Sequence, residues 1–78
     1  MSGLGFDREI LKSLFTTKMP FGKYKGTLLV DVPEYYLNWL NNKGFPKGKL
    51  GMQLATVYEI KLNGLESILA PLRDLNNV

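Results

Sequence analysis

The segment on which the predicted fold depends reads Met19-Pro20-Phe21-Gly22-Lys23-Tyr24-Lys25-Gly26. A short, mostly apolar run at residues 27–30 follows it. Two such runs separated by about five residues that include glycine are typical of a β-hairpin. Gly22 and Gly26 allow positive φ at the two ends of the loop. We therefore predict strands at 19–21 and 27–30, and Pro20 marks the first as an edge strand because proline donates no backbone hydrogen bond.

Helices are predicted before and after this hairpin. Residues 6–15 carry an apolar stripe at helical spacing, and Asp7 is a suitable N-cap. Residues 47–62 form the longest apolar pattern of helical period, which the Asn63-Gly64 pair ends. We expect residues 65–69 to add another turn or two.

A further helix is predicted directly after the hairpin. Asp31 and Glu34 fit a capping box, with Pro33 in the first turn, where its missing amide costs little. Gly44 is expected to end the helix in a left-handed conformation. The predicted buried stripe of this helix consists of Tyr36, Trp39 and Leu40.

These elements predict a small α+β domain, in which one two-stranded antiparallel β-hairpin packs against three to four helices. The 78 residues suffice for a single domain, residues 1–78, with an ordered core at about 6–72. A lone hairpin is marginally stable in water, so one face must be covered. We expect residues 19–30 to pack against helices that contain Leu14, Trp39 and Val57.

The composition disfavours an enzyme. The chain has no histidine and no cysteine, which removes Ser-His and Cys-His nucleophile pairs and the usual zinc ligands. Asp7 and Glu9 belong to the first turn of a predicted helix, where acidic side chains stabilise the helix dipole. Gly22 and Gly26 lack the G-K-[ST] continuation of a phosphate-binding loop. We therefore expect no catalysis, no metal and no cofactor.

The chain shows no secretory leader and no apolar run long enough to cross a membrane. Together with the lack of cysteine, this predicts a cytoplasmic protein without a membrane partner.

Positive charge is concentrated in the middle of the chain. Residues 18–49 hold six lysines and two carboxylates, a net charge of +4 within a total of +3. Such a segment can contact a polyanion, or it can consist of solvated lysines that keep a small domain soluble. Aromatic residues interleaved with lysines suit single-stranded nucleic acid, and Tyr24 is the aromatic expected to be exposed. The candidate nucleic-acid-binding residues are Lys18, Lys23, Tyr24, Lys25, Lys47 and Lys49.

A protein-interaction module or homodimer is the alternative function. It rests on an apolar run near the C-terminus that exceeds what a small core needs, and large uncovered apolar patches usually mark a partner site. The residues concerned are Leu62, Leu65, Ile68, Leu69 and Leu72.

Four motifs carry a family resemblance. They are residues 19–26, Asp31-Val32-Pro33-Glu34-Tyr35-Tyr36-Leu37 with Trp39, Lys43-Gly44-Phe45-Pro46 with Gly48-Lys49-Leu50-Gly51, and Glu59-Ile60-Lys61 with Asn63-Gly64-Leu65. Together they resemble a bacterial family of small uncharacterised proteins labelled putative quorum-sensing-regulated virulence factor. The resemblance spans roughly residues 6–72. It implies a compact α+β domain and no established activity.

The shorter core of this pattern, residues 19–26 followed by the helix that contains Trp39, is similar to a module appended to some DEDD-type 3′–5′ exonucleases. The acidic exonuclease domain itself is missing from the 78 residues. This second resemblance implies a nucleic-acid contact through Lys23, Tyr24 and Lys25, and no catalysis.

Overall fold

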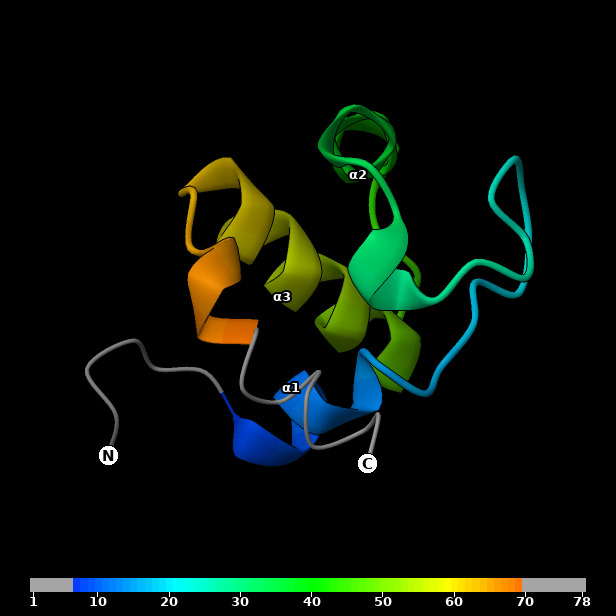
Figure 1. Cartoon of the computed structure of the whole chain (residues 1–78). Helices are drawn as coiled ribbons and strands as arrows, with labels where there is room; N and C mark the ends of the chain where they lie inside the picture. Colours follow the sequence, from blue (N-terminus) through cyan, green and yellow to red (C-terminus); the bar gives the residue numbers. More distant parts are fainter. Residues whose placement is uncertain (1–6, 70–78) are drawn as a thin grey trace.

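Residues 7–69 are described by the computed structural model, and they fold into helices, with a long loop between Ser13 and Leu29 and shorter connections elsewhere. The order is α1 (Arg8–Ser13), the 3₁₀ helix η1 (Leu29–Asp31), α2 (Glu34–Lys43), α3 (Lys49–Leu62) and the 3₁₀ helix η2 (Glu66–Leu69). Figure 1 shows α3 in the middle of the molecule, between α1 and α2, while the loop before η1 extends to one side.

The predicted α+β class is wrong, because the described residues contain no β-strand. Where the hairpin was expected, a single isolated antiparallel bridge joins Lys18 and Leu28. The Met19 amide donates to the Thr27 carbonyl at 2.8 Å, and the Gly26 amide donates to the Met19 carbonyl at the same distance. The residues between them form turns, and after Leu28 the chain enters the helical turn η1.

The burial of η1 explains why no second strand forms. Leu29 is 0% exposed and Val30 is 4% exposed, so two consecutive side chains both lie in the core. In a strand, consecutive side chains point to opposite faces, so one of the two would point away from the core. The helical turn directs both side chains inward. Two backbone hydrogen bonds hold this turn in place. The Leu29 amide donates to the Thr17 carbonyl at 3.0 Å, and the Val30 amide donates to the Leu14 carbonyl at 3.1 Å.

The first helix begins as the sequence indicates. The Asp7 carboxylate accepts from the backbone amides of Glu9 and Ile10, at 2.8 and 3.4 Å, which satisfies two of the unpaired donors at the helix start. The α-helix is shorter than the predicted segment 6–15, and the chain continues beyond Ser13 as a turn. Phe6, expected to precede the cap, lies outside the described residues.

The start of α2 differs from the predicted capping box. Pro33 itself is the N-cap, no side chain caps the helix, and Asp31 belongs to η1 instead. The proline can stand there because an N-cap residue has extended φ and ψ. At the other end, Gly44 is the C-cap with a φ of +98°.

The expected burial of Trp39 is also wrong. The buried residues of α2 are Tyr36, Leu37 and Leu40, whereas Trp39 is 49% exposed. The stripes 36-37-40 and 36-39-40 both fit a helical period, and they differ by a rotation of the helix about its axis. Since Leu37 turns to the core, Trp39 turns to the surface.

The longest helix, α3, packs closely against the loop that precedes it and is hydrogen-bonded to the α1 region. Gly51 is buried, and a Cβ at this position would overlap the carbonyl oxygen of Pro46. The buried Gln53 donates from Nε2 to the hydroxyls of Ser13 and Thr17, at 2.8 and 3.2 Å. This amide therefore ties α3 to α1 without leaving a buried donor unpaired.

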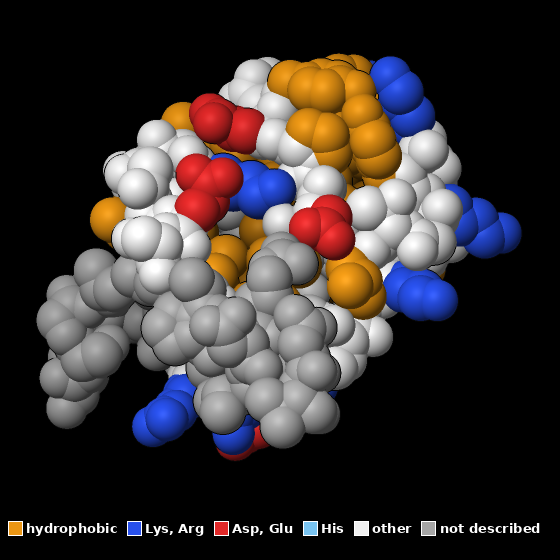
Figure 2. Space-filling model, in the orientation of Figure 1, with side chains coloured by type: hydrophobic (Ala, Val, Ile, Leu, Met, Phe, Trp, Pro, Cys, Tyr) orange, Lys and Arg blue, Asp and Glu red, His pale blue; other side chains and the backbone are white. Residues whose placement is uncertain are grey.

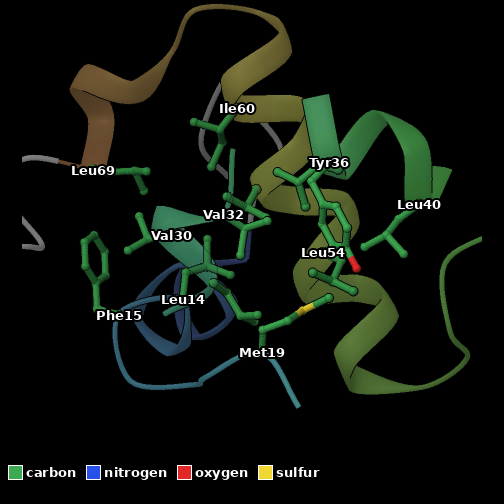
Figure 3. Packing of buried hydrophobic residues seen from close by; sticks show 13 residues of the cluster. Leu14, Phe15, Met19, Val30, Val32, Tyr36, Leu40, Leu54, Ile60 and Leu69 are labelled. Atoms are coloured by element: carbon green, nitrogen blue, oxygen red, sulfur yellow. The ribbon is translucent and has the colours of Figure 1, made fainter. Parts of the chain in front are cut away.

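The C-terminal end of α3 reverses in a Schellman motif. Gly64 has a φ of +67°, the Leu65 amide donates to the Ile60 carbonyl at 2.8 Å, and the Gly64 amide donates to the Lys61 carbonyl at 3.2 Å. The reversal brings η2 back over the core, where Leu69 is 4% exposed. In Figure 3, Leu69 lies beside Phe15 and Val30, while Tyr36 and Leu40 lie at the other end of the cluster.

The C-terminal leucines do not form one exposed patch. Leu69 is buried and Leu65 packs partly buried against the core, whereas Leu62 is 53% exposed. Leu72 lies outside the described residues, as does the side chain of Ile68.

Within residues 7–69, no helix has both the length and the apolar character that a bilayer span requires.

Substituting Gly51 by alanine is expected to lower the free energy of unfolding. In an open helix position this change stabilises by up to ~1 kcal/mol. Here the methyl group meets the Pro46 carbonyl, so we expect a net loss of about 1–3 kcal/mol, measured by urea denaturation. Met52→Ala, at the exposed neighbouring position, is the control and should shift the free energy much less. A Gly51→Ala variant as stable as the parent would show that this contact is not tight.

The two leucines that flank the reversal should respond differently to truncation. Leu69→Ala is expected to cost about 2–5 kcal/mol, because it opens a cavity in the core. Leu62→Ala should change the free energy of unfolding by no more than about 0.5 kcal/mol, because the side chain is half exposed. Equal losses in denaturation curves would contradict the placement of η2 over the core.

Candidate functional site

The loop before η1 is held against α2 by a glycine. Gly22 has a φ of +77°, and a Cβ there would overlap the hydroxyl of Tyr36. Glycine is therefore required at this position for two reasons, the backbone conformation and the close approach. Gly26, with a φ of +89°, closes the other end of the turn and has open space around it. The loop thus delivers Lys23 and Tyr24 to the side of α2.

The aromatic side chains of this region contact one another. Tyr24 meets Tyr36 edge to face with ring centres 4.9 Å apart, and Tyr36 stacks on Trp39 at 5.5 Å with an angle of 25° between the ring planes. Tyr35 meets Tyr24 edge to face at 6.2 Å. Tyr36 is buried, but Tyr35 and Trp39 are 57% and 49% exposed. The rings therefore form a supported aromatic surface, one side of which is open to solvent.

Two lysines stand at the ends of this surface. The Lys23 ammonium donates to the Tyr35 hydroxyl at 3.1 Å and lies 5.6 Å from the ring centre of Tyr24. The Lys43 ammonium lies 5.1 Å from the ring centre of Trp39. We name the set Lys23, Tyr24, Tyr35, Tyr36, Trp39 and Lys43 the aromatic–lysine cluster.

Hydrogen bonds shift the pKa values of Lys23, Tyr24 and Tyr35. The hydrogen bond to Tyr35, and then the charges of Tyr35 and Tyr24, raise the pKa of Lys23 above its usual value. The hydrogen bond with Tyr24, followed by that from Lys23, lowers the pKa of Tyr35, while the same hydroxyl contact raises the pKa of Tyr24. Lys23 is consequently a full positive charge at neutral pH.

Charge is distributed unevenly over the surface. On the face drawn in Figure 2, several lysine or arginine side chains lie along the edge on which the loop and α2 lie, and apolar side chains gather beside them over α2; other basic side chains lie in the middle of this face, beside acidic ones, and at its bottom. The acidic side chains in this view lie away from that edge. An anion that approaches the cluster therefore meets mainly positive charge.

The predicted site residues are only partly brought together. Lys23 and Tyr24 belong to the cluster, although Tyr24 is half-buried and not the freely exposed ring that was expected. Lys49 instead borders a hollow beside α1, with Lys12 and Glu9 among its neighbours. The other predicted lysines are exposed, and none has a contact to a cluster ring among the described interactions; they are Lys18, Lys25 and Lys47.

Three members of the cluster were missed as site residues from the sequence. Tyr35, Trp39 and Lys43 follow one another at intervals of four residues, which places them on one face of α2. That spacing was the available signal. The prediction that Trp39 is buried conflicts with this reading of the spacing.

A second surface feature lies between α1, α2 and α3. It is an open groove of about 530 Å³, lined in part by Ile10, Phe45 and Tyr58. Met52 and Leu62, which are 58% and 53% exposed, contribute apolar surface to its wall. Asp7 and Glu59 add carboxylates.

Comparison with known sequences gives a consistent result. A protein family described as "Putative quorum-sensing-regulated virulence factor" matches residues 7–72. Proteins from Escherichia coli strains K12 and O157:H7, each named "Uncharacterized protein YpeB", are 46% identical over 68 residues, which are 86% of this chain and 94% of each relative. No solved structure matches the chain. The match covers every described helix, and the chain therefore belongs to the family of putative quorum-sensing-regulated virulence factors.

Proposed function

We propose that this chain is a non-catalytic module that binds nucleic acid through the aromatic–lysine cluster. The observation that carries the proposal is the pairing of two lysine ammoniums with exposed rings, Lys23 beside Tyr35 and Lys43 beside Trp39. Nucleic acid offers both groups that such a surface accepts, phosphates for the ammoniums and base faces for the rings.

The composition supports the non-catalytic part of the proposal. Without histidine or cysteine, acid–base and nucleophilic steps near neutral pH would fall to carboxylates. The described residues contain no group of three side chains suited to hold a metal ion. Asp7 is occupied by helix capping. A cytoplasmic location belongs to the same proposal, because a chain without cysteine suits a reducing compartment in which nucleic acid is present.

Replacing both end lysines by alanine is expected to weaken nucleic-acid binding without unfolding the chain. Both are surface side chains, and exposed lysine contacts contribute little to stability. We expect the log–log dependence of affinity on salt to become shallower by about 1–2 units, because each lost phosphate contact removes 0.7–0.9. The measurement is fluorescence anisotropy of labelled single-stranded and duplex DNA and RNA at several low salt concentrations, with the Lys23→Ala/Lys43→Ala variant.

The matched control is Lys12→Ala/Lys49→Ala, which removes the same charge from the hollow beside α1. This control should retain most of the affinity. Equal losses in the two variants would mean that net charge, and not the cluster, sets the affinity. If the parent protein fails to bind any of these probes at tens of micromolar, or if its binding is indifferent to salt, the proposed function is refuted.

A second candidate function is self-association through the groove. The observation that favours it is the exposure of Met52 and Leu62 on one wall of an apolar groove, since such patches are frequent at interfaces. Leu62 is the one member of the predicted C-terminal leucine set that is strongly exposed among those described.

Sedimentation velocity decides whether a second copy occupies the groove. A dimer is expected for the parent chain, and a monomer for Met52→Lys/Leu62→Lys, because two buried ammoniums would prevent apolar contact. Both positions are exposed, so the variant should keep its helical circular dichroism. A parent chain that sediments as a monomer at all concentrations would remove this candidate.

A further inference from the structure

We infer that the cluster selects unpaired bases, so that the ligand is single-stranded nucleic acid lying along α2 with Trp39 as its stacking platform. This inference deepens the proposed function and rests on it. It adds discrimination between single-stranded and duplex nucleic acid. Phosphate contact alone does not supply this discrimination, since lysines bind the backbone of both.

The order of side chains along α2 carries the inference. Lys23 reaches the helix at Tyr35, Trp39 follows one turn later, and Lys43 follows one turn after that. Positive charge therefore stands at both ends of an aromatic stripe. A strand that crosses the stripe can place phosphates at the two ends and bases on the rings between them.

The environment of Trp39 suits a stacking role. Tyr36 supports the indole at 5.5 Å with nearly parallel planes, and Tyr36 is itself anchored in the core at 8% exposure. The platform is thus held in place before a base arrives, which reduces the entropy lost on binding. The Lys43 ammonium now lies over the indole. Its flexible four-carbon stem lets it move to a phosphate when a base takes that place.

A duplex exposes far less of its base faces to the aromatic–lysine cluster than a single strand does. Its bases are stacked on one another, and only their edges are open in the grooves. Single-stranded binding instead uses the face of each base, which every base possesses, so little sequence preference is expected. From Tyr35 to Lys43 the helix rises about 12 Å, the length of roughly four stacked nucleotides. Oligonucleotides shorter than this should bind weakly.

The test uses the only tryptophan of the chain as its reporter. The probes are the thymidine octamer dT8, the uridine octamer U8, a DNA hairpin with eight base pairs, and a heparin fragment as a polyanion without bases. Each is titrated at low salt against the parent, Trp39→Phe and Trp39→Leu. Trp39 emission is followed in the parent, and the affinity of labelled probes is measured by anisotropy in all three proteins.

We expect dT8 and U8 to quench the emission of the parent, and heparin and the hairpin to leave it largely unchanged. Trp39→Leu should lose about 5- to 150-fold in affinity for the octamers, and Trp39→Phe should recover part of it. Both variants should bind heparin as the parent does. A dinucleotide should bind far more weakly than dT8.

The inference is overturned if the octamers bind Trp39→Leu as tightly as the parent, or if the hairpin is preferred. In either case the proposed function survives, provided that the Lys23→Ala/Lys43→Ala variant still loses affinity. Failure of every probe to bind the parent would overturn both. Should Trp39→Leu not fold, the quenching comparison in the parent and the affinity of Trp39→Phe still decide the question.

Discussion

The burial of three apolar residues before α2, Leu29, Val30 and Val32, is the constraint on which the arrangement of the chain depends. Their side chains are between 0% and 4% exposed, although two of them are consecutive. A helical turn can bury consecutive side chains on one side, whereas a strand cannot. The backbone of this turn is hydrogen-bonded to the residues that follow α1. On the other side, the Lys61 ammonium donates to the Val32 carbonyl at 2.7 Å, which secures the segment to α3.

This constraint also positions the candidate site. The loop that leads into η1 reaches the side of α2, where Gly22 permits contact with Tyr36. Tyr36 then has two roles: its ring fills the core, and it also packs edge to face against Tyr24 and stacks on Trp39. Since aromatic pairs of this kind contribute about 0.5–1.5 kcal/mol beyond their burial, the exposed rings are held by the same residue that stabilises the domain. The site is therefore part of the folded structure and not a mobile attachment to it.

The proposed chemistry follows from what the chain contains and from where it is placed. The sequence has eight lysines and four tyrosines, and the fold gathers two of these lysines and three of these tyrosines in the cluster. The similarity to the E. coli relatives extends over 94% of their length. Binding by the cluster would combine a salt-dependent phosphate term with a stacking term, and the two can be separated by choice of probe.

Local signals in the sequence determined a large part of this protein. Asp7 as a helix cap, Gly44 and Gly64 as helix ends, the long helix α3 and the family membership all depend on neighbouring residues or on a linear pattern. The tertiary structure decided what local patterns leave open. A strand and a helical turn fit residues 27–30 equally well, and the burial of both Leu29 and Val30 in one core favours the helical turn. Likewise, Leu37 and Trp39 compete for the same core, and the rotation of α2 that buries the leucine places Trp39 at the surface beside Lys43.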